Sequence, residues 1–155
     1  MNPRLTALAG LLLLVILPLP LTAAPRPQFG LPTATLRFGT NVLTAQIAAD
    51  DASRETGLMS RTNLGEDEGM VFVFPSPRPV AFWMKDTLIP LSIAYVGASG
   101  RIFEIHELKP HDETPVPSAS EAVLCAIEAP RGWFDRHGVL AGDMVGGVPP
   151  ASSAK

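Results

Sequence analysis

A period-two alternation of apolar and polar side chains most constrains what this 155-residue chain can fold into. The alternation is clearest at residues 35–38 and again at residues 43–47. Successive side chains of a β-strand point to opposite faces of a sheet, so this pattern predicts strands with one buried face. The short stretch between the two runs, residues 39–41, contains a glycine and predicts a hairpin connection.

Other apolar runs extend this pattern along the chain. They predict strands at residues 70–74, 80–84, 91–96, 101–108 and 122–129. Residues 70–74 are apolar on both faces, which is typical of a central strand. Helices are predicted only at residues 50–61, where Asp50 or Asp51 can act as the N-cap, and at residues 133–137. We therefore expect a mainly β fold, an antiparallel β-sandwich or barrel with one or two short helices.

The amino terminus has the organisation of a secretory signal peptide. Arg4 provides the positive charge, residues 5–17 are apolar, and prolines interrupt the run before small residues near position 24. The apolar run is shorter than the roughly 20 residues that cross a bilayer, so an uncleaved anchor is the less favoured alternative. We expect residues 1–24 to be removed and the protein to be exported, periplasmic or extracellular, without stable membrane insertion.

The remaining chain divides by composition into three parts. We expect an extended proline-rich arm at residues 25–33, a single β-rich domain at residues 34–145 and a disordered tail at residues 146–155. Cys125 is the only cysteine, so no intrachain disulfide can form and stability has to come from apolar burial. The sequence does not indicate an oligomeric state.

Charge and motifs argue against several classes of function. The formal net charge is -3 and the basic residues are scattered, which argues against a nucleic-acid partner. Nucleotide-binding, zinc-protease and serine-hydrolase motifs are missing from the sequence. Glu104, His106 and residues 111–113 offer metal-binding atoms but no recognised spacing, so we predict neither a metal site nor a cofactor.

The stretch FWMKDTLIPL, residues 82–91, contains the most distinctive candidate site. Trp83 beside Lys85 forms a pairing suited to sugar rings or anionic groups. The structural alternative places Trp83 over a second face of the fold and makes Asp86 the cap of a turn. In this alternative Phe82 and Met84 fill the core and the stretch is core and turn rather than a binding site.

Two functional hypotheses follow from these residues. The first is a small extracytoplasmic binding or accessory module for a polar or carbohydrate-like ligand, with Arg61, Trp83, Lys85, Asp86, Glu104 and His106 as the binding residues. The second is a cell-envelope hydrolase or isomerase in which Glu104, His106 and Asp86 supply acid and base groups. Glu104 and His106 are two residues apart on one predicted strand, so they should be neighbours on one face.

Five motifs resemble those of the domain of unknown function 192 family. They are RETGLMSR (54–61), EGMVFVF (68–74), FWMKDTLIPLSIAYV (82–96), GRIFEI (100–105) and RHGVLAGDMV (136–145). The resemblance covers about residues 36–145 and implies a compact, jelly-roll-like β fold with a short helix and no assigned activity. This chain departs from the family at Asp86, where Asn is usual, and at Ser92, where Asp is usual. A Ser hydroxyl does not ionise near neutral pH, so Ser92 cannot act as a general base.

Overall fold

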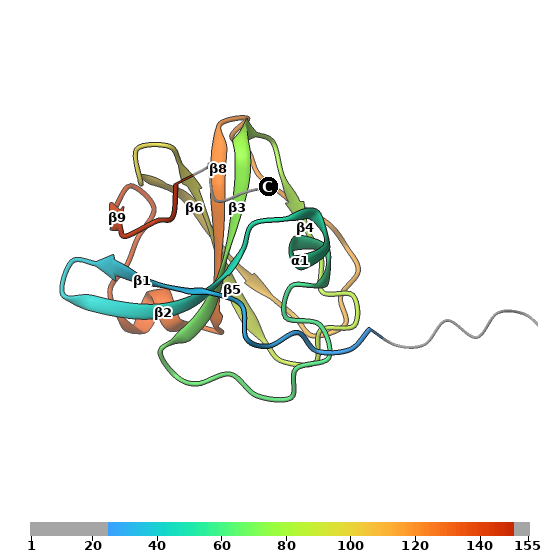
Figure 1. Ribbon diagram of the computed structural model, residues 1–155. Helices are drawn as coiled ribbons and strands as arrows, with labels where there is room; N and C mark the ends of the chain where they lie inside the picture. Colours follow the sequence, from blue (N-terminus) through green and yellow to red (C-terminus); the bar gives the residue numbers. More distant parts are fainter. Residues whose placement is uncertain (1–24, 151–155) are drawn as a thin grey trace, which may run out of the picture.

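The computed structural model describes residues 25–150 and shows a mainly β fold (Figure 1). The strands are β1 (Thr33–Phe38), β2 (Asn41–Ala48), β3 (Glu68–Arg78), β4 (Ala81–Phe82), β5 (Leu91–Gly97), β6 (Ile102–Leu108), β7 (Val116–Pro117), β8 (Val123–Pro130) and β9 (Val145–Gly146). The helices are α1 (Asp51–Thr56) and α2 (Trp133–Arg136). The predicted signal peptide and the last residues of the predicted tail lie outside the described residues.

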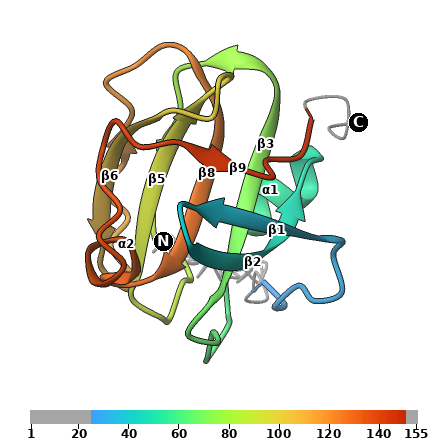
Figure 2. The same ribbon diagram turned by 90° about the vertical axis from the view of Figure 1, so that its left-hand side faces the viewer.

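Seven strands form one curled sheet in the order β6-β5-β8-β3-β2-β1-β9, and β4 pairs with β7 in a small second sheet (Figure 2). The expected antiparallel arrangement needs one correction, because β2 and β3 are parallel. A parallel pair requires a crossover connection, and α1 with the following loop provides it. The two edges of the sheet meet at an isolated bridge between Arg101 and Met144.

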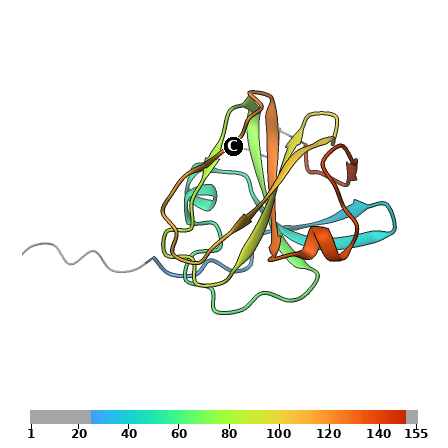
Figure 3. The same ribbon diagram turned by 180° about the vertical axis from the view of Figure 1, so that it is seen from behind.

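The sheet buries apolar side chains on both faces. One face packs around Trp133 and Phe134 of α2, together with Leu36, Phe38, Leu43, Val71, Val73, Val96, Ile102, Cys125 and Ile127. The other face lies under α1 and the β4–β7 sheet and includes Leu58, Met70, Phe72, Phe74, Met84, Leu91, Ile93, Tyr95 and Ala126. Figure 3 shows α2 and α1 at opposite sides of the sheet. Burial on both faces explains the apolar run of β3, which was predicted to be central and is flanked by β8 and β2.

Helix α1 begins where the sequence predicted and ends earlier. The Asp50 side chain accepts a hydrogen bond from the Ser53 backbone N–H, and Ser53 Oγ accepts one from the Asp50 N–H, which completes a capping box. Gly57 ends the helix with a φ of 48°, a conformation that side chains disfavour. Residues 57–60 therefore form turns, and the last part of the predicted helix is absent.

A bulge in β6 changes the predicted alternation of residues 101–108. Tyr95 pairs with Glu104, whereas the next residue, Val96, pairs with Ile102 and skips Phe103. Ile102 therefore joins the same core as Ile105 instead of sharing the face of Glu104, as the strict alternation predicted. The predicted strand at residues 80–84 is likewise shorter, because only β4 pairs there.

Residues 25–32, which belong to the proline-rich arm, form no helix or strand, and side chains of this segment attach it to the domain. Gln28 Nε2 donates hydrogen bonds to the backbone carbonyls of Ser53 (2.9 Å) and Gly57 (2.8 Å), at the end of α1. The Ile47 N–H donates to the Pro32 carbonyl at 2.8 Å, next to the start of β1. The arm thus contacts both the sheet and the helix.

Candidate functional site

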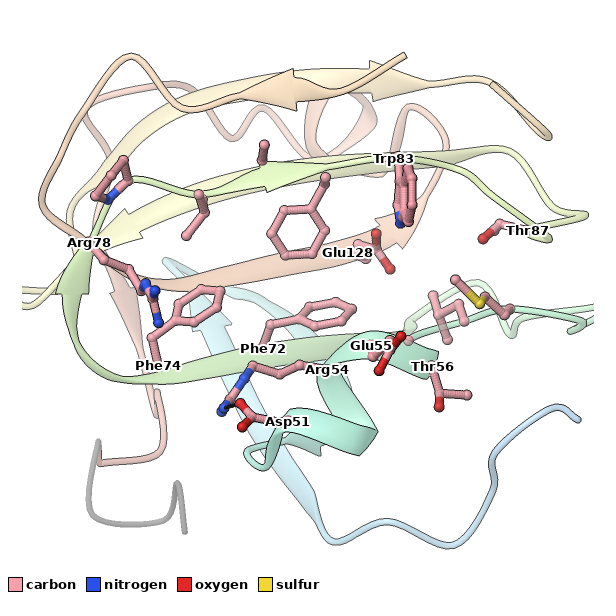
Figure 4. Close-up of a pocket in the computed structure, with 17 residues that line it drawn as sticks. Asp51, Arg54, Glu55, Thr56, Phe72, Phe74, Arg78, Trp83, Thr87 and Glu128 are labelled. Atoms are coloured by element: carbon pink, nitrogen blue, oxygen red, sulfur yellow. Dashed lines mark hydrogen bonds and ion pairs between the residues drawn. The ribbon is translucent and has the colours of Figure 1, made fainter. Parts of the chain in front are cut away.

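A pocket of about 340 Å³ opens on the face of the sheet that carries α1 (Figure 4). Its walls are α1 with the turn that follows it, the phenylalanines of β3, and the segment from Arg78 to Trp83, while β8 contributes Glu128. The crossover between the parallel strands β2 and β3 is what places α1 over this face. The pocket therefore depends on the one strand pairing that the alternation did not predict.

Glu128 is the most unusual side chain of the pocket. Its residue is 4% exposed, and it shares the face of the sheet with Ala126 because it is two residues further along β8. Among residues 25–150, no side chain or backbone group forms a hydrogen bond or ion pair with its carboxyl group. Burial raises the pKa of Glu128 from 4.5 to about 8. At neutral pH the carboxyl group is therefore mostly protonated.

Aromatic rings surround this carboxyl group. Figure 4 shows Glu128 between Trp83 and Phe72. The rings of Phe72 and Phe82 meet edge to face with centroids 4.9 Å apart. Trp83 is 48% exposed, so one part of its indole lines the pocket while another part is open to solvent. Such a wall offers a ligand a large apolar surface and leaves Glu128 as the polar group at its base.

The charged residues at the pocket rim differ in how strongly the protein holds them. Arg54 donates to the carbonyls of Ala49 (2.6 Å) and Val73 (2.8 Å), and its other terminal nitrogen pairs with Asp51 at 2.6 Å. Arg78 has no comparable side-chain partner among the described residues, and Figure 4 places it beyond Phe74 at the end of the pocket away from Trp83. Arg54 is thus a structural cation, whereas Arg78 is available to a ligand.

The structure places Trp83 and Lys85 together, as the binding hypothesis required. Lys85 Nζ lies 5.5 Å from the centroid of the Trp83 ring, but Lys85 does not line the pocket. Asp86 has a φ of 52°, and its carbonyl accepts a hydrogen bond from the Ser60 N–H at 2.8 Å. Asp86 therefore connects the turn after Trp83 to the segment after α1 through its backbone.

Arg61 contacts the amino-terminal arm. It is 5% exposed and donates hydrogen bonds to the Gln28 carbonyl (2.6 Å) and to Gln46 Oε1 (2.8 Å). Its guanidinium lies 4.4 Å from the centroid of the Phe29 ring. These contacts hold the Arg61 side chain between the arm and β2. Arg61 lies outside the pocket.

Glu104 and His106 are adjacent on β6, as their spacing predicted. His106 Nε2 and Glu104 Oε2 are 2.8 Å apart, and Glu104 Oε1 accepts a hydrogen bond from the Ala119 N–H at 2.8 Å. Glu104 lines a separate shallow hollow, which Asp86 does not border. The structure therefore brings together two of the three acid-base candidates and leaves Asp86 apart from them.

Other polar groups singled out by the sequence have structural surroundings. Ser92 Oγ accepts a hydrogen bond from the Gly132 N–H at 2.7 Å and donates one to Glu107. Burial raises the pKa of the Cys125 thiol to about 12, which makes it unreactive. Between residues 25 and 150, no group of three or more His, Cys, Asp or Glu side chains is arranged to hold a metal ion. In the same range, no helix is both long and apolar enough to span a membrane.

Sequence reasoning found Trp83 and missed Glu128. A signal for Glu128 was present, because it is the one charged residue in the otherwise apolar run at residues 122–129. A charge in a strand that is buried on both faces has to be neutralised or paired. Its aromatic neighbours come from β3 and β4. These strands are distant from β8 in the sequence, so no local motif indicates that their side chains lie next to Glu128.

Comparisons with known proteins identify a family and two solved structures with a similar fold. Residues 34–147 match the model of the family DUF192, described as "Uncharacterized ACR". One similar solved structure is that of a proposed transcription regulator from Sinorhizobium meliloti 1021, whose sequence is 35% identical to this chain. The two structures superpose with a TM-score of 0.74, and the match covers 77% of this chain and 97% of that chain. A protein of unknown function from Novosphingobium aromaticivorans DSM 12444 is also 35% identical, with a TM-score of 0.67, covering 80% of this chain and 93% of that one. No curated protein matches the chain.

Proposed function

The chain belongs to the DUF192 family, and from that premise we propose that it is a small exported binding module whose pocket takes up a small ligand with polar groups. One observation carries the proposal. The half-exposed Trp83 and the buried, unpartnered Glu128 line the same pocket. An apolar wall with a few convergent polar groups is typical of sites for small molecules.

The proposed ligand is polar or carbohydrate-like and lies with one face against Trp83. Sugar rings have apolar faces that stack on indole and hydroxyl groups that need hydrogen-bond partners. Thr87 and Glu128 line the pocket near Trp83 and can provide such partners (Figure 4). Arg78 adds a cation at the far end. Of the residues predicted from the sequence, Trp83 keeps its proposed role in this pocket and Lys85 lies beside it.

Export is part of the same proposal. It is supported by the sequence of residues 1–24, which combines a positive charge, a short apolar run and a small-residue end. A binding module outside the cytoplasm would be periplasmic or extracellular. The similar Sinorhizobium protein is described as a proposed transcription regulator. We do not propose this role for the present chain, because its net charge of -3 does not suit a DNA-binding surface.

The test is a binding screen on the purified protein. Monosaccharides, cell-wall sugars, amino acids and small amines are screened by thermal shift, because a ligand that binds only the folded state raises the melting temperature. We expect at least one class to bind with a stoichiometry near one by calorimetry, and Trp83→Ala to weaken binding at least tenfold. Lys109→Ala, an exposed substitution outside this pocket, is the control. Absence of binding by all classes would refute the binding proposal.

The second candidate is a cell-envelope hydrolase or isomerase. It is supported by the raised pKa of Glu128, since a carboxylic acid that keeps its proton near neutral pH can act as a general acid. Glu104 and His106 form a further acid-base pair on β6. Turnover of any ligand found in the screen distinguishes this candidate from a binding module, because only an enzyme converts the bound compound.

A further inference from the structure

We infer that the ligand of this pocket carries a cationic group, an ammonium or quaternary ammonium, which pairs with the Glu128 carboxylate between the aromatic rings. This inference rests on the proposed binding function of the pocket and specifies the chemical class of its ligand. It assigns Glu128 as the residue that recognises the charge. It also assigns Phe72, Phe82 and Trp83 as the rings that surround the cation.

The first argument is the missing partner of Glu128. A buried carboxyl group is normally hydrogen-bonded or paired with a cation, because burying it alone is costly. Glu128 has no such partner among residues 25–150, and its residue is 96% shielded from solvent. Its carboxyl group faces the pocket in Figure 4, so an entering ligand can supply the partner that the protein does not.

The second argument is the composition of the walls. The face of an aromatic ring attracts a cation, and the attraction is larger in sites that exclude water. Figure 4 shows Phe72 on one side of Glu128 and Trp83 on another, and Phe82, which also lines the pocket, is in edge-to-face contact with Phe72. A carboxylate among three aromatic side chains is complementary to an ammonium ion with methyl or methylene substituents. A strongly hydrated anion gains nothing from such walls.

The third argument is that the basic side chains near the pocket are held by other groups or lie away from Glu128. Arg54 is held by two backbone carbonyls and by Asp51, and Lys85 lies over Trp83 outside the pocket lining. Arg78 lies at the opposite end of the pocket (Figure 4). Glu55 of α1 also lines the pocket, and its side chain forms no hydrogen bond or ion pair within residues 25–150.

Tyr95 of β5, the strand paired with β8, is a further titratable group close enough to be affected by the charge of Glu128. Burial, and then the charges of Glu104 and Glu128, raise its pKa, so its hydroxyl keeps its proton through the physiological range. Its hydroxyl donates to the Val116 carbonyl. Tyr95 therefore contributes neither a charge nor a free donor to the pocket.

Binding of a cation then becomes coupled to a proton. Glu128 holds a proton below a pKa of about 8, and a cation beside it favours the ionised form. Each cation that binds below that pH therefore releases a proton, and its affinity rises with pH until Glu128 is ionised in the free protein. A neutral ligand that accepts a hydrogen bond from protonated Glu128 would show the opposite trend. The sign of the pH dependence thus distinguishes the two chemistries.

The experiment compares choline with its uncharged carbon analogue 3,3-dimethylbutan-1-ol, by calorimetry on the purified protein between pH 6 and pH 9. Choline keeps its charge throughout this range, so any pH dependence comes from the protein. We expect choline affinity to increase by roughly tenfold per pH unit up to about pH 8 and then level off. We expect the alcohol to bind at least tenfold more weakly at pH 9.

Two variants complete the test. Glu128→Gln should remove both the pH dependence and the preference for choline, whereas Glu113→Gln, which removes an exposed carboxylate from a loop, should change neither. Circular dichroism and the fluorescence of the buried Trp133 verify that both variants are folded. Equal affinity for the two compounds, or choline affinity that falls as the pH rises, overturns the inference.

Failure of this inference can be separated from failure of the proposed function. If neutral sugars bind in a Trp83-dependent manner and choline does not, the pocket is a binding site and the cationic class is wrong. If neither choline nor any compound of the wider screen binds, the binding function itself is wrong. If choline binds equally well to Glu128→Gln, another residue recognises the charge and the assignment of Glu128 is refuted.

Discussion

Replacing Glu128 with Gln should remove a loss of stability that the native protein undergoes as the pH rises. The pKa of Glu128 is about 8 in the folded state and 4.5 without burial. The folded protein therefore keeps a proton that the unfolded chain loses, so stability falls as the pH rises from about 4.5 to about 8. Gln cannot ionise and has nearly the same shape, so the variant should not show this loss.

The two pKa values set the expected size of the effect. One pKa unit corresponds to about 1.4 kcal/mol, and integration over both titrations gives a loss of about 4 kcal/mol between pH 5 and pH 9. The native protein should lose about this amount relative to Glu128→Gln over that interval. A difference in the free energy of unfolding that is the same at every pH reflects only the exchange of the carboxyl group for an amide. The predicted effect is that this difference changes with pH.

The assay is urea denaturation followed by circular dichroism at pH 5, 6, 7, 8 and 9. Free energies of unfolding come from linear extrapolation, and Glu113→Gln is measured in parallel as the control for loss of an exposed carboxylate. The control should follow the native protein at every pH. If the difference between the native protein and Glu128→Gln stays constant within about 1 kcal/mol, Glu128 ionises normally and the reasoning about the pocket is wrong.

Four other results are expected. Gly69→Ala should lower the free energy of unfolding in urea by about 3 kcal/mol or more, because a Cβ there would lie 2.3 Å from the Glu128 carbonyl oxygen. A variant as stable as the native protein would contradict this close approach. Asp50→Ala should cost about 1 kcal/mol in the same assay through loss of the α1 cap, and no change would show that the capping box is dispensable. The Cys125 thiol should not react with a thiol reagent in the native protein and should react on unfolding, whereas rapid labelling of the native protein would refute its burial. Expression of the full chain followed by fractionation and amino-terminal sequencing should give an exported protein beginning near residue 25, and retention in the cytoplasm with residues 1–24 intact would refute export.

The strands were predictable because their burial is periodic. The hairpin of β1 and β2 turns at Gly39, and the buried run of β3 lies between β8 and β2, as its apolar composition indicated. The parallel pairing of β2 with β3 was not predictable in this way, since alternation reports which face is buried and not which strand is adjacent. The bulge at Phe103 was missed for a related reason, because one extra residue breaks the alternation without any local sequence signal.

The candidate site was predictable only in part. Trp83 was predicted because its pairing with Lys85 suits sugar rings or anionic groups, and the pairing of Glu104 with His106 followed from their spacing on one strand. Glu128 was not predicted, because the run that contains it, AVLCAIEA, is otherwise apolar and includes no site motif. The pocket combines residues from α1, β3, β4 and β8, and their proximity arises from the crossover rather than from any motif.

The attachment of Gln28 to α1 matters for how this domain is delimited. The family match begins at residue 34, so trimming the chain to the matched region would delete the amide that binds the last carbonyls of the helix. That helix is a wall of the pocket. A shortened protein could thus retain every strand of the sheet and still lose ligand affinity, and a negative binding result obtained with it would concern the missing arm rather than the pocket.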